Sequence, residues 1–322
     1  MIWLDQAKGL GIVLVVFGHC LRGLMAAGLA NEDGPWGVVD AAIYAFHMPL
    51  FFFLAGHTFE ASALKRSPGA YLVRRSERLL WPLALWTWIF NVFKLAAGPS
   101  ANAAVTLDSF PFFPLPPRDH MWFLWALYLV SLAAYLLGPF WRRRMPLPVW
   151  GLYFVGAALL ALDLPAALAS PWFTSAATIA PHFVAGVLLA RIPWRARVEE
   201  GGSLPVTLGA LSAFAVPVAL AASGRPIPVV GGTIASVALC VLLVARPAPD
   251  RLGRGLSTLG QASLAIYVMH TIASAALRVA LLKVGFEELA VHLVLGTLIG
   301  VLAPLAAYFA LRRLGWLRLA GL

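Results

Sequence analysis

Residues 9–29 form the first long apolar run of the chain and read GLGIVLVVFGHCLRGLMAAGL. A transmembrane helix needs about 20 predominantly apolar residues to span the hydrocarbon core of a bilayer, and this run has that length. Nine more apolar runs follow, at 38–59, 78–97, 121–140, 147–163, 177–191, 204–222, 228–245, 262–282 and 289–311. The sequence therefore predicts an all-α, polytopic integral membrane protein with about ten transmembrane helices.

The composition of the whole chain agrees with this fold class. Of its 322 residues, 61% are hydrophobic and only 12% are charged, and the mean hydropathy is +0.84. A soluble domain carries about 25% charged residues, so this chain has too few charges to cover a surface in water. A soluble cytosolic enzyme, a disordered chain and a nucleic-acid-binding module are thereby excluded. No internal repeat or long linker divides the sequence, and we expect one transmembrane domain over residues 1–322.

Basic residues outnumber acidic ones by 24 to 14, and their positions indicate an orientation. Cytoplasmic loops of membrane proteins carry an excess of Lys and Arg. If the N-terminus is cytoplasmic, 18 of the 24 cations fall at the inner ends of the predicted helices. These are Lys8, Lys65, Arg66, Arg74, Arg75, Arg78, Arg142, Arg143, Arg144, Arg191, Arg195, Arg197, Arg246, Arg251, Arg254, Arg312, Arg313 and Arg318. Both termini are therefore predicted to be cytoplasmic, with the basic loops beside anionic lipid headgroups and no nucleic acid as partner.

Four ionisable residues lie in or just before the first apolar run. At 100° per residue they fall on one helix face within an arc of about 100°. They are Asp5, Lys8, His19 and Arg22. The rise from Lys8 to His19 is about 16 Å, which reaches from the inner membrane edge to about mid-bilayer. Ionisable side chains at such depth usually face a cavity or the bundle interior.

This stripe has a chemical interpretation and a structural one. A neutral His19 imidazole could take a proton from an attacking hydroxyl group. The Lys8 ammonium could hold a phosphate-bearing cofactor at the cytoplasmic mouth of a polar channel. Alternatively, His19 only forms a hydrogen bond to a neighbouring helix.

A second polar stripe lies on the apolar run at 262–282. Five residues fall within about 80° of one another on a helix, namely Ser263, Tyr267, His270, Ser274 and Arg278. This face could contact a sugar or line the same cavity as His19. Hydrogen bonding between helices would explain it equally well.

Three further polar residues are candidates for a site. His47 lies near the outer end of the second run, and Pro49 removes a backbone donor and is expected to bend that helix. Asp119 and His120 precede the fourth run, where an acceptor molecule could dock, although the polarity of an outer loop would also explain them. No HExxH or CxxC metal motif, Walker motif or dinucleotide-binding glycine pattern is present.

The N-terminal segment resembles a known family. Residues 3–19, which read WLDQAKGLGIVLVVFGH, are similar to the first helix of the membrane-bound acyltransferase-3 family. The pattern of that family is an Arg, ten further residues and then a His. Here Lys8 takes the place of the Arg, which keeps the charge but loses the two-pronged geometry of a guanidinium. Lys at this place is similar to the fucose 4-O-acetylase-like branch of the family.

Later segments extend the resemblance over nearly the whole chain. Residues 46–56, FHMPLFFFLAG, are similar to the second helix of the family, and residues 74–82, RRSERLLWP, to the basic entry of the third. Residues 120–124 and 259–270 are similar to later helices. Members of the family are bacterial inner-membrane enzymes that O-acylate sugars of envelope or exported glycans.

The resemblance implies a reaction and a set of site residues. An acyl group, usually acetyl, would pass from cytoplasmic acyl-CoA to a glycan hydroxyl reached from the outer face, without a metal. His19 would act as general base or transient acyl carrier, assisted by Lys8 and Asp5. The coenzyme phosphates would be bound by Lys8, Arg74, Arg75 and Arg78. The acceptor would be contacted by His47, Asp119, His120, Tyr267 and His270.

A polytopic secondary transporter of a small or lipid-linked solute is the alternative interpretation. Intramembrane His and Arg residues would suit such a carrier. Secondary carriers are commonly built from repeats with paired broken helices, and neither feature is evident in this sequence. A non-catalytic subunit of a glycan-modifying assembly is a third possibility, which the polar stripe of the first helix disfavours.

Overall fold

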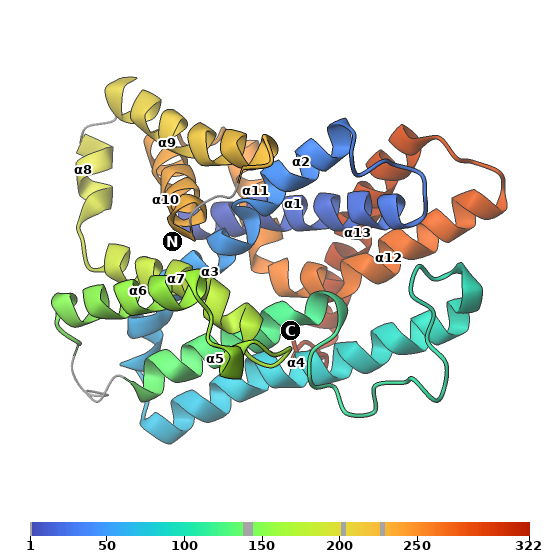
Figure 1. Cartoon of the computed structure of the whole chain (residues 1–322), viewed down its shortest axis with the longest axis horizontal. Coiled ribbons are helices and arrows are strands. Elements are labelled where there is room, and N and C mark those ends of the chain that lie inside the picture. The colour runs from blue at the N-terminus through green and yellow to red at the C-terminus, as the bar shows by residue number, and fades with distance from the viewer. Residues whose placement is uncertain (1, 138–143, 201–203, 226–228) are drawn as a thin grey trace.

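The described part of the chain is mostly helical. The computed structural model describes residues 2–137, 144–200, 204–225 and 229–322, and these ranges contain no strand. Figure 1 shows α1 in the interior of the bundle, with α4 and α5 along one side. The α-helices are α1 (Ile2–Ala26), α2 (Pro35–Tyr44), α3 (His47–Ala63), α4 (Pro68–Ala97), α5 (Trp122–Leu136), α6 (Leu147–Leu162), α7 (Thr174–Ala190), α8 (Trp194–Glu200), α9 (Leu204–Ala222), α10 (Val229–Ala245), α11 (Asp250–Gln261), α12 (Ser263–Lys283) and α13 (Leu289–Arg313). Three short 3-10 helices are η1 (Gly98–Ser100), η2 (Asp119–Met121) and η3 (Ala166–Leu168).

Six helical segments of the described chain are long and apolar enough to cross a membrane, in agreement with a membrane protein. They are Ile2–Ala26, Pro35–Ala63, Gly69–Ser100, Leu204–Ala222, Ser263–Lys283 and Leu289–Arg313. The other four apolar runs correspond to the shorter helices α5, α6, α7 and α10. The number of spans and the cytoplasmic placement of both termini stay predictions. Arg142, Arg143, the end of the fourth run (138–140) and the first residue of the eighth (228) lie outside the described residues.

The second predicted span is divided into two helices. α2 ends at Tyr44 and α3 begins at His47, so the break falls at Ala45 and Phe46. The expectation of a bend at Pro49 itself is therefore wrong. Pro49 lies in the first turn of α3, where a missing N–H removes no helical hydrogen bond. The break places His47 at the start of a helix.

α1 is the central helix of the bundle. It packs against α3, α10, α11, α12 and α13. Its side chains Ile12, Val15, Val16, Leu21 and Leu24 are each 1% exposed or less. Because neighbouring helices surround α1, its few polar side chains face protein and cavities instead of lipid.

Two glycines permit close packing of α1 on the polar helix α11. A Cβ atom on Gly9 would collide with the carbonyl oxygen of Leu256, and one on Gly260 would collide with that of Asp5. Small residues at such positions let two helix backbones approach each other closely. This packing holds the N-terminal end of α1, which carries Asp5 and Lys8.

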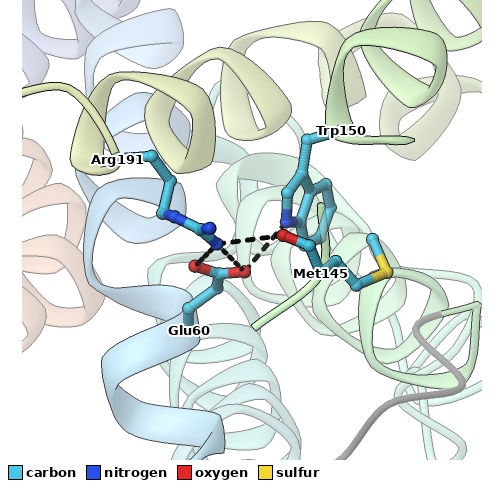
Figure 2. Close-up of polar contacts among 4 residues, drawn as sticks. All are labelled: Glu60, Met145, Trp150 and Arg191. Carbon is cyan, nitrogen blue, oxygen red and sulfur yellow. Dashed lines mark hydrogen bonds and ion pairs between the residues drawn. The ribbon is translucent and has the colours of Figure 1, made fainter. Parts of the chain in front are cut away.

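A buried ion pair joins three helices near the predicted inner side. Figure 2 shows the Glu60 carboxylate of α3 between Arg191, at the end of α7, and Trp150 of α6. Nη1 of Arg191 lies 2.9 Å from Oε2 of Glu60 and also donates to the carbonyl oxygen of Met145 at 3.1 Å. The indole N–H of Trp150 donates to Oε1 of Glu60 at 2.9 Å. With the two charged side chains only 13% and 19% exposed, this network fixes the three helices relative to one another.

The long connection between α4 and α5 covers the predicted outer end of α1. Nδ2 of Asn102 donates to the carbonyl oxygen of Gly23 at 2.8 Å. The indole N–H of Trp88 on α4 donates to the carbonyl oxygen of Phe112 at 3.2 Å. These bonds hold the connection against the bundle, and its last residues enter the site described next.

Candidate active site

Three histidines that are far apart in the sequence meet at one place in the bundle. His19 comes from α1, His120 from η2 and His270 from α12. Nδ1 of His19 lies 2.8 Å from Nε2 of His270, and the two rings are stacked with centroids 5.0 Å apart. The ring centroid of His120 lies 6.0 Å from that of His19 and 5.4 Å from that of His270. Three residues singled out from the sequence thus form one cluster.

The short helix η2 brings His120 into this cluster. Its first residue, Asp119, has a φ of 51°, a left-handed conformation that is uncommon for a residue with a side chain. The Asp119 carboxylate binds the Lys94 ammonium of α4 at 2.8 Å, and the hydroxyl of Tyr267 donates to the carbonyl oxygen of His120. Burial is the main cause that lowers the pKa of His120 well below its ordinary value, and the His270 ring and the Lys94 charge lower it further. The imidazole of His120 is therefore neutral near pH 7.

Arg22 and His47 border the cluster on the side of α2 and α3. Arg22 makes two hydrogen bonds of 2.8 Å to the Asp40 carboxylate, and its guanidinium carbon lies 3.1 Å from the centroid of the Tyr44 ring. The rings of Tyr44 and His47 have centroids 4.4 Å apart, and Nδ1 of His47 donates to the carbonyl oxygen of Ile43 at 2.8 Å. The charge of Arg22 is thus balanced by Asp40, and Tyr44 and His47 offer hydrogen-bonding groups on this side of the cluster.

Two cavities meet at His19 on the predicted outer side. The polar outer cavity has a volume of about 350 Å³. Its polar lining consists of His19, Arg22, Tyr44, His47, Asp119, His120, Tyr267 and Thr271. The apolar outer cavity, about 540 Å³, lies between α1, α4 and α12, and both His19 and His270 line it. A hydroxyl group in either cavity would therefore meet the His19 imidazole.

A third cavity lies at the predicted cytoplasmic side and has a volume of about 710 Å³. Its charged lining consists of Asp5, Lys8, Arg75, Arg78 and Arg312. Nζ of Lys8 lies 3.7 Å from Oδ1 of Asp5. Because four cations face one carboxylate, this inner cavity attracts anions, and its Arg and Lys side chains suit phosphate groups in particular.

The inner cavity and the polar outer cavity share part of their walls. Tyr267 and Met48 line both of them. These two residues, from α3 and α12, therefore form a wall common to the two cavities.

The structure unites most of the residues predicted from sequence but not all. Lys8, Arg75 and Arg78 line the inner cavity, whereas the side chain of Arg74 is exposed and lines none of the three cavities described here. The sequence placed Arg312 among the inner cations but did not predict it as a residue of the site. It also missed Tyr44, which carried no signal, and Lys94, a cation near the end of the apolar run at 78–97.

The fold and the cavities define a class of protein, an all-helical membrane protein with a histidine cluster beside a cationic inner cavity and a polar outer one. A family model described as an acyltransferase domain matches residues 1–311. The chain therefore belongs to the acyltransferase-3 family.

Two curated proteins are similar to part of the chain. One is Nodulation protein NolL of Sinorhizobium fredii, 35% identical over 136 residues, which are 41% of this chain and 34% of that protein. The other is Nodulation protein NolL of Mesorhizobium japonicum, 30% identical over 148 residues, which are 45% of this chain and 37% of that protein. Each match thus spans little more than a third of the relative's length. No solved structure matches the chain.

Proposed function

We propose that the protein is an O-acyltransferase of the bacterial inner membrane that moves an acyl group from cytoplasmic acyl-CoA to a hydroxyl of an envelope or exported glycan. Acetyl is the acyl group that we propose. The observation that carries the proposal is the position of His19, which lines both outer cavities, while Tyr267 and Met48 form a wall common to the polar outer cavity and the cationic inner one. Membership of an acyltransferase family supports the same reaction.

The inner cavity is the proposed donor site. Lys8, Arg75, Arg78 and Arg312 would bind the phosphate groups of coenzyme A through charge-assisted hydrogen bonds. Asp5 contacts Lys8 and would orient its ammonium group. The thioester end of the coenzyme would then extend toward Tyr267 and Met48, next to the chamber that holds His19.

The polar outer cavity is the proposed acceptor site. Tyr44, His47 and His120 line it and offer hydrogen-bonding groups to sugar hydroxyls. His19 would take the proton of the reacting glycan hydroxyl while the oxygen of that hydroxyl attacks the thioester carbonyl carbon. A C–O bond forms and the C–S bond breaks, and the departing thiolate takes the proton from His19. The products are a glycan ester and the free thiol of coenzyme A, with His19 restored to its neutral form.

Transfer of label tests the proposal directly. Purified protein would be incubated with radiolabelled acetyl-CoA and a glycan extract from cells that lack the gene. We expect base-labile label on the glycan and release of free thiol, and loss of both in the His19→Gln variant. His57→Gln is the matched control, because His57 lines none of the three cavities. It should transfer label at the wild-type rate.

Two results would overturn the proposal. One is full turnover by a folded His19→Gln protein, which would remove His19 from the chemical step. The other is a wild-type protein that binds the extract but releases no thiol from acetyl-CoA, which would favour the transporter interpretation. Monodispersity in detergent, measured for each variant, shows that the protein is folded.

A further inference from the structure

The hydrogen bonds of His270 determine which of its two ring nitrogens carries a proton. Nδ1 of His270 lies 2.7 Å from the carbonyl oxygen of Tyr267 and 3.1 Å from that of Ile266. A carbonyl oxygen accepts hydrogen bonds and never donates them. Nδ1 of His270 must therefore carry a hydrogen.

The surroundings of His270 favour the neutral ring. Its side chain is 0% exposed, and a buried charge needs a partner of opposite sign. Lys94 and Arg22 are already paired with Asp119 and Asp40, whereas Arg278 lines the same apolar outer cavity and would repel a further positive charge. A neutral imidazole with its hydrogen on Nδ1 has a free lone pair on Nε2.

That lone pair faces His19. Nε2 of His270 lies 2.8 Å from Nδ1 of His19, so Nδ1 of His19 must carry the hydrogen of this bond. Within the described part of the chain this is the one hydrogen bond of the His19 side chain. In the neutral form of His19, Nε2 therefore has no proton, and the half-buried ring lines both outer cavities.

We propose that His270 is a positioning residue, which accepts a hydrogen bond from the Nδ1–H of His19 and thereby presents the unprotonated Nε2 of His19 to the acceptor hydroxyl. The relay runs from Nδ1 of His19 to Nε2 of His270 and from Nδ1 of His270 to the carbonyl oxygen of Tyr267. This role rests on the proposed function, because it makes His19 ready to take a proton. It replaces the role of acceptor contact that the sequence predicted for His270.

A carboxylate often orients a catalytic histidine, and the structure explains why an imidazole serves here. The nearby carboxylates already have partners, since Asp40 binds Arg22 and Asp119 binds Lys94. A neutral imidazole accepts the hydrogen bond from His19 without placing an unpaired anion in the interior, where such a charge would be costly. The histidine relay therefore fixes the tautomer of His19 at little electrostatic cost.

Two substitutions at one position separate orientation from packing. In His270→Gln the amide oxygen lies near the place of Nε2 and can still accept the proton of His19. In His270→Leu that acceptor is lost while the apolar volume is kept. We expect kcat to fall by about 10²- to 10⁴-fold in His270→Leu, the range that a mispositioned general base costs. His270→Gln should stay within about tenfold of wild type, and the KM for acetyl-CoA should change little in either variant.

The tautomer itself can be observed without any activity. Nitrogen NMR of protein with isotopically labelled histidine distinguishes a protonated Nδ1 from a protonated Nε2, and His19→Gln identifies the His19 signals. We expect the Nδ1–H form of His19 in wild type and in His270→Gln, and its loss in His270→Leu. His182→Leu is the matched control, since His182 is also buried and bonded at 2.7 Å to Thr233, but lines none of the three cavities.

The outcomes separate this inference from the proposed function. Absence of acyl transfer by wild-type protein refutes the proposed function, while the NMR experiment still reports the tautomer. A protonated Nε2 on His19 in wild type refutes the positioning role. Wild-type kcat in His270→Leu, or a raised KM for the acceptor extract with unchanged kcat, also refutes it, and the latter result would make His270 a substrate contact.

Discussion

Lys8 and His19 lie on one face of α1 but line different cavities. Lys8 is at the cationic inner cavity, and His19 is at the two outer cavities. Arg22, one turn beyond His19, is bound to Asp40 by two hydrogen bonds of 2.8 Å, whereas Lys8 lies 3.7 Å from Asp5. One helix thus carries the proposed phosphate-binding charge near its N-terminus and the proposed base nearer its C-terminus. Substitutions at these two residues should have different kinetic effects.

Replacement of Lys8 should weaken coenzyme binding and leave the chemical step nearly intact. A hydrogen bond to a charged group is worth about 1.5–3 kcal/mol, and 1.4 kcal/mol corresponds to a factor of ten in affinity. Lys8→Ala should therefore raise the KM for acetyl-CoA about tenfold or more, with a small change in kcat. Lys8→Arg should stay near wild type. Initial rates at varied acetyl-CoA give both constants.

Lys65→Ala is the control for this measurement. Lys65 is exposed, follows α3 and lines none of the three cavities, so its removal changes the net charge equally without touching the proposed donor site. An equal rise of KM in both alanine variants would mean a long-range effect of net charge. An unchanged KM in Lys8→Ala would remove Lys8 from the donor site.

The sequence predicted the site residues that break an apolar pattern. His19 and His270 could be found because an ionisable group inside a span is costly and points to a cavity. Helical spacing alone did not show that their rings meet, since that contact depends on how α1 and α12 pack. Tyr44 is an ordinary residue of an apolar segment, and only the fold places it beside Arg22 and His47.

At the scale of the helix, the apolar runs predicted element positions well because hydrophobic length is what a bilayer selects. The run at 204–222 coincides with α9, and that at 262–282 differs from α12 by one residue at each end. α11 was missed because its sequence is polar. The sequence predicted a bend at Pro49, whereas the break between α2 and α3 lies at Ala45 and Phe46. A proline fits the first turn of a helix and need not bend it there.

The helices α3, α6 and α7 depend on the Glu60 network for their relative position. Removal of one partner of a buried ion pair leaves the other charge uncompensated, which costs about 3–5 kcal/mol when the pair is fully buried. Glu60 and Arg191 retain some exposure, so Glu60→Gln should cost about 3 kcal/mol or less. We expect a clearly lower melting temperature of the detergent-solubilised protein, measured by thermal unfolding.

Glu77→Gln is the matched control for this variant. Glu77 pairs with Arg318 at 3.2 Å, but the two side chains are 54% and 88% exposed, and exposed pairs contribute little to stability. Its melting temperature should equal that of wild type. Equal melting temperatures for both Gln variants would contradict the structural role of the Glu60 network.

At the scale of the whole molecule, the proposed reaction requires one orientation in the membrane. The cationic inner cavity must face the cytoplasm, where acyl-CoA is found, and the two outer cavities must face the opposite side. The distribution of Lys and Arg predicts the same orientation independently, since most cations fall at the inner helix ends. Two lines of argument, one from charge and one from the proposed chemistry, therefore make a single testable prediction.

Cysteine labelling can decide the orientation, because both natural cysteines, Cys20 and Cys240, are buried and should react little. Asp108→Cys places an exposed thiol in the connection between α4 and α5, and Arg251→Cys places one on α11. A membrane-impermeant maleimide should label the first variant on intact spheroplasts and the second only after permeabilisation. The reverse pattern would put the inner cavity on the side that has no acyl-CoA, and the proposed donor site would then be wrong even if His19 were essential.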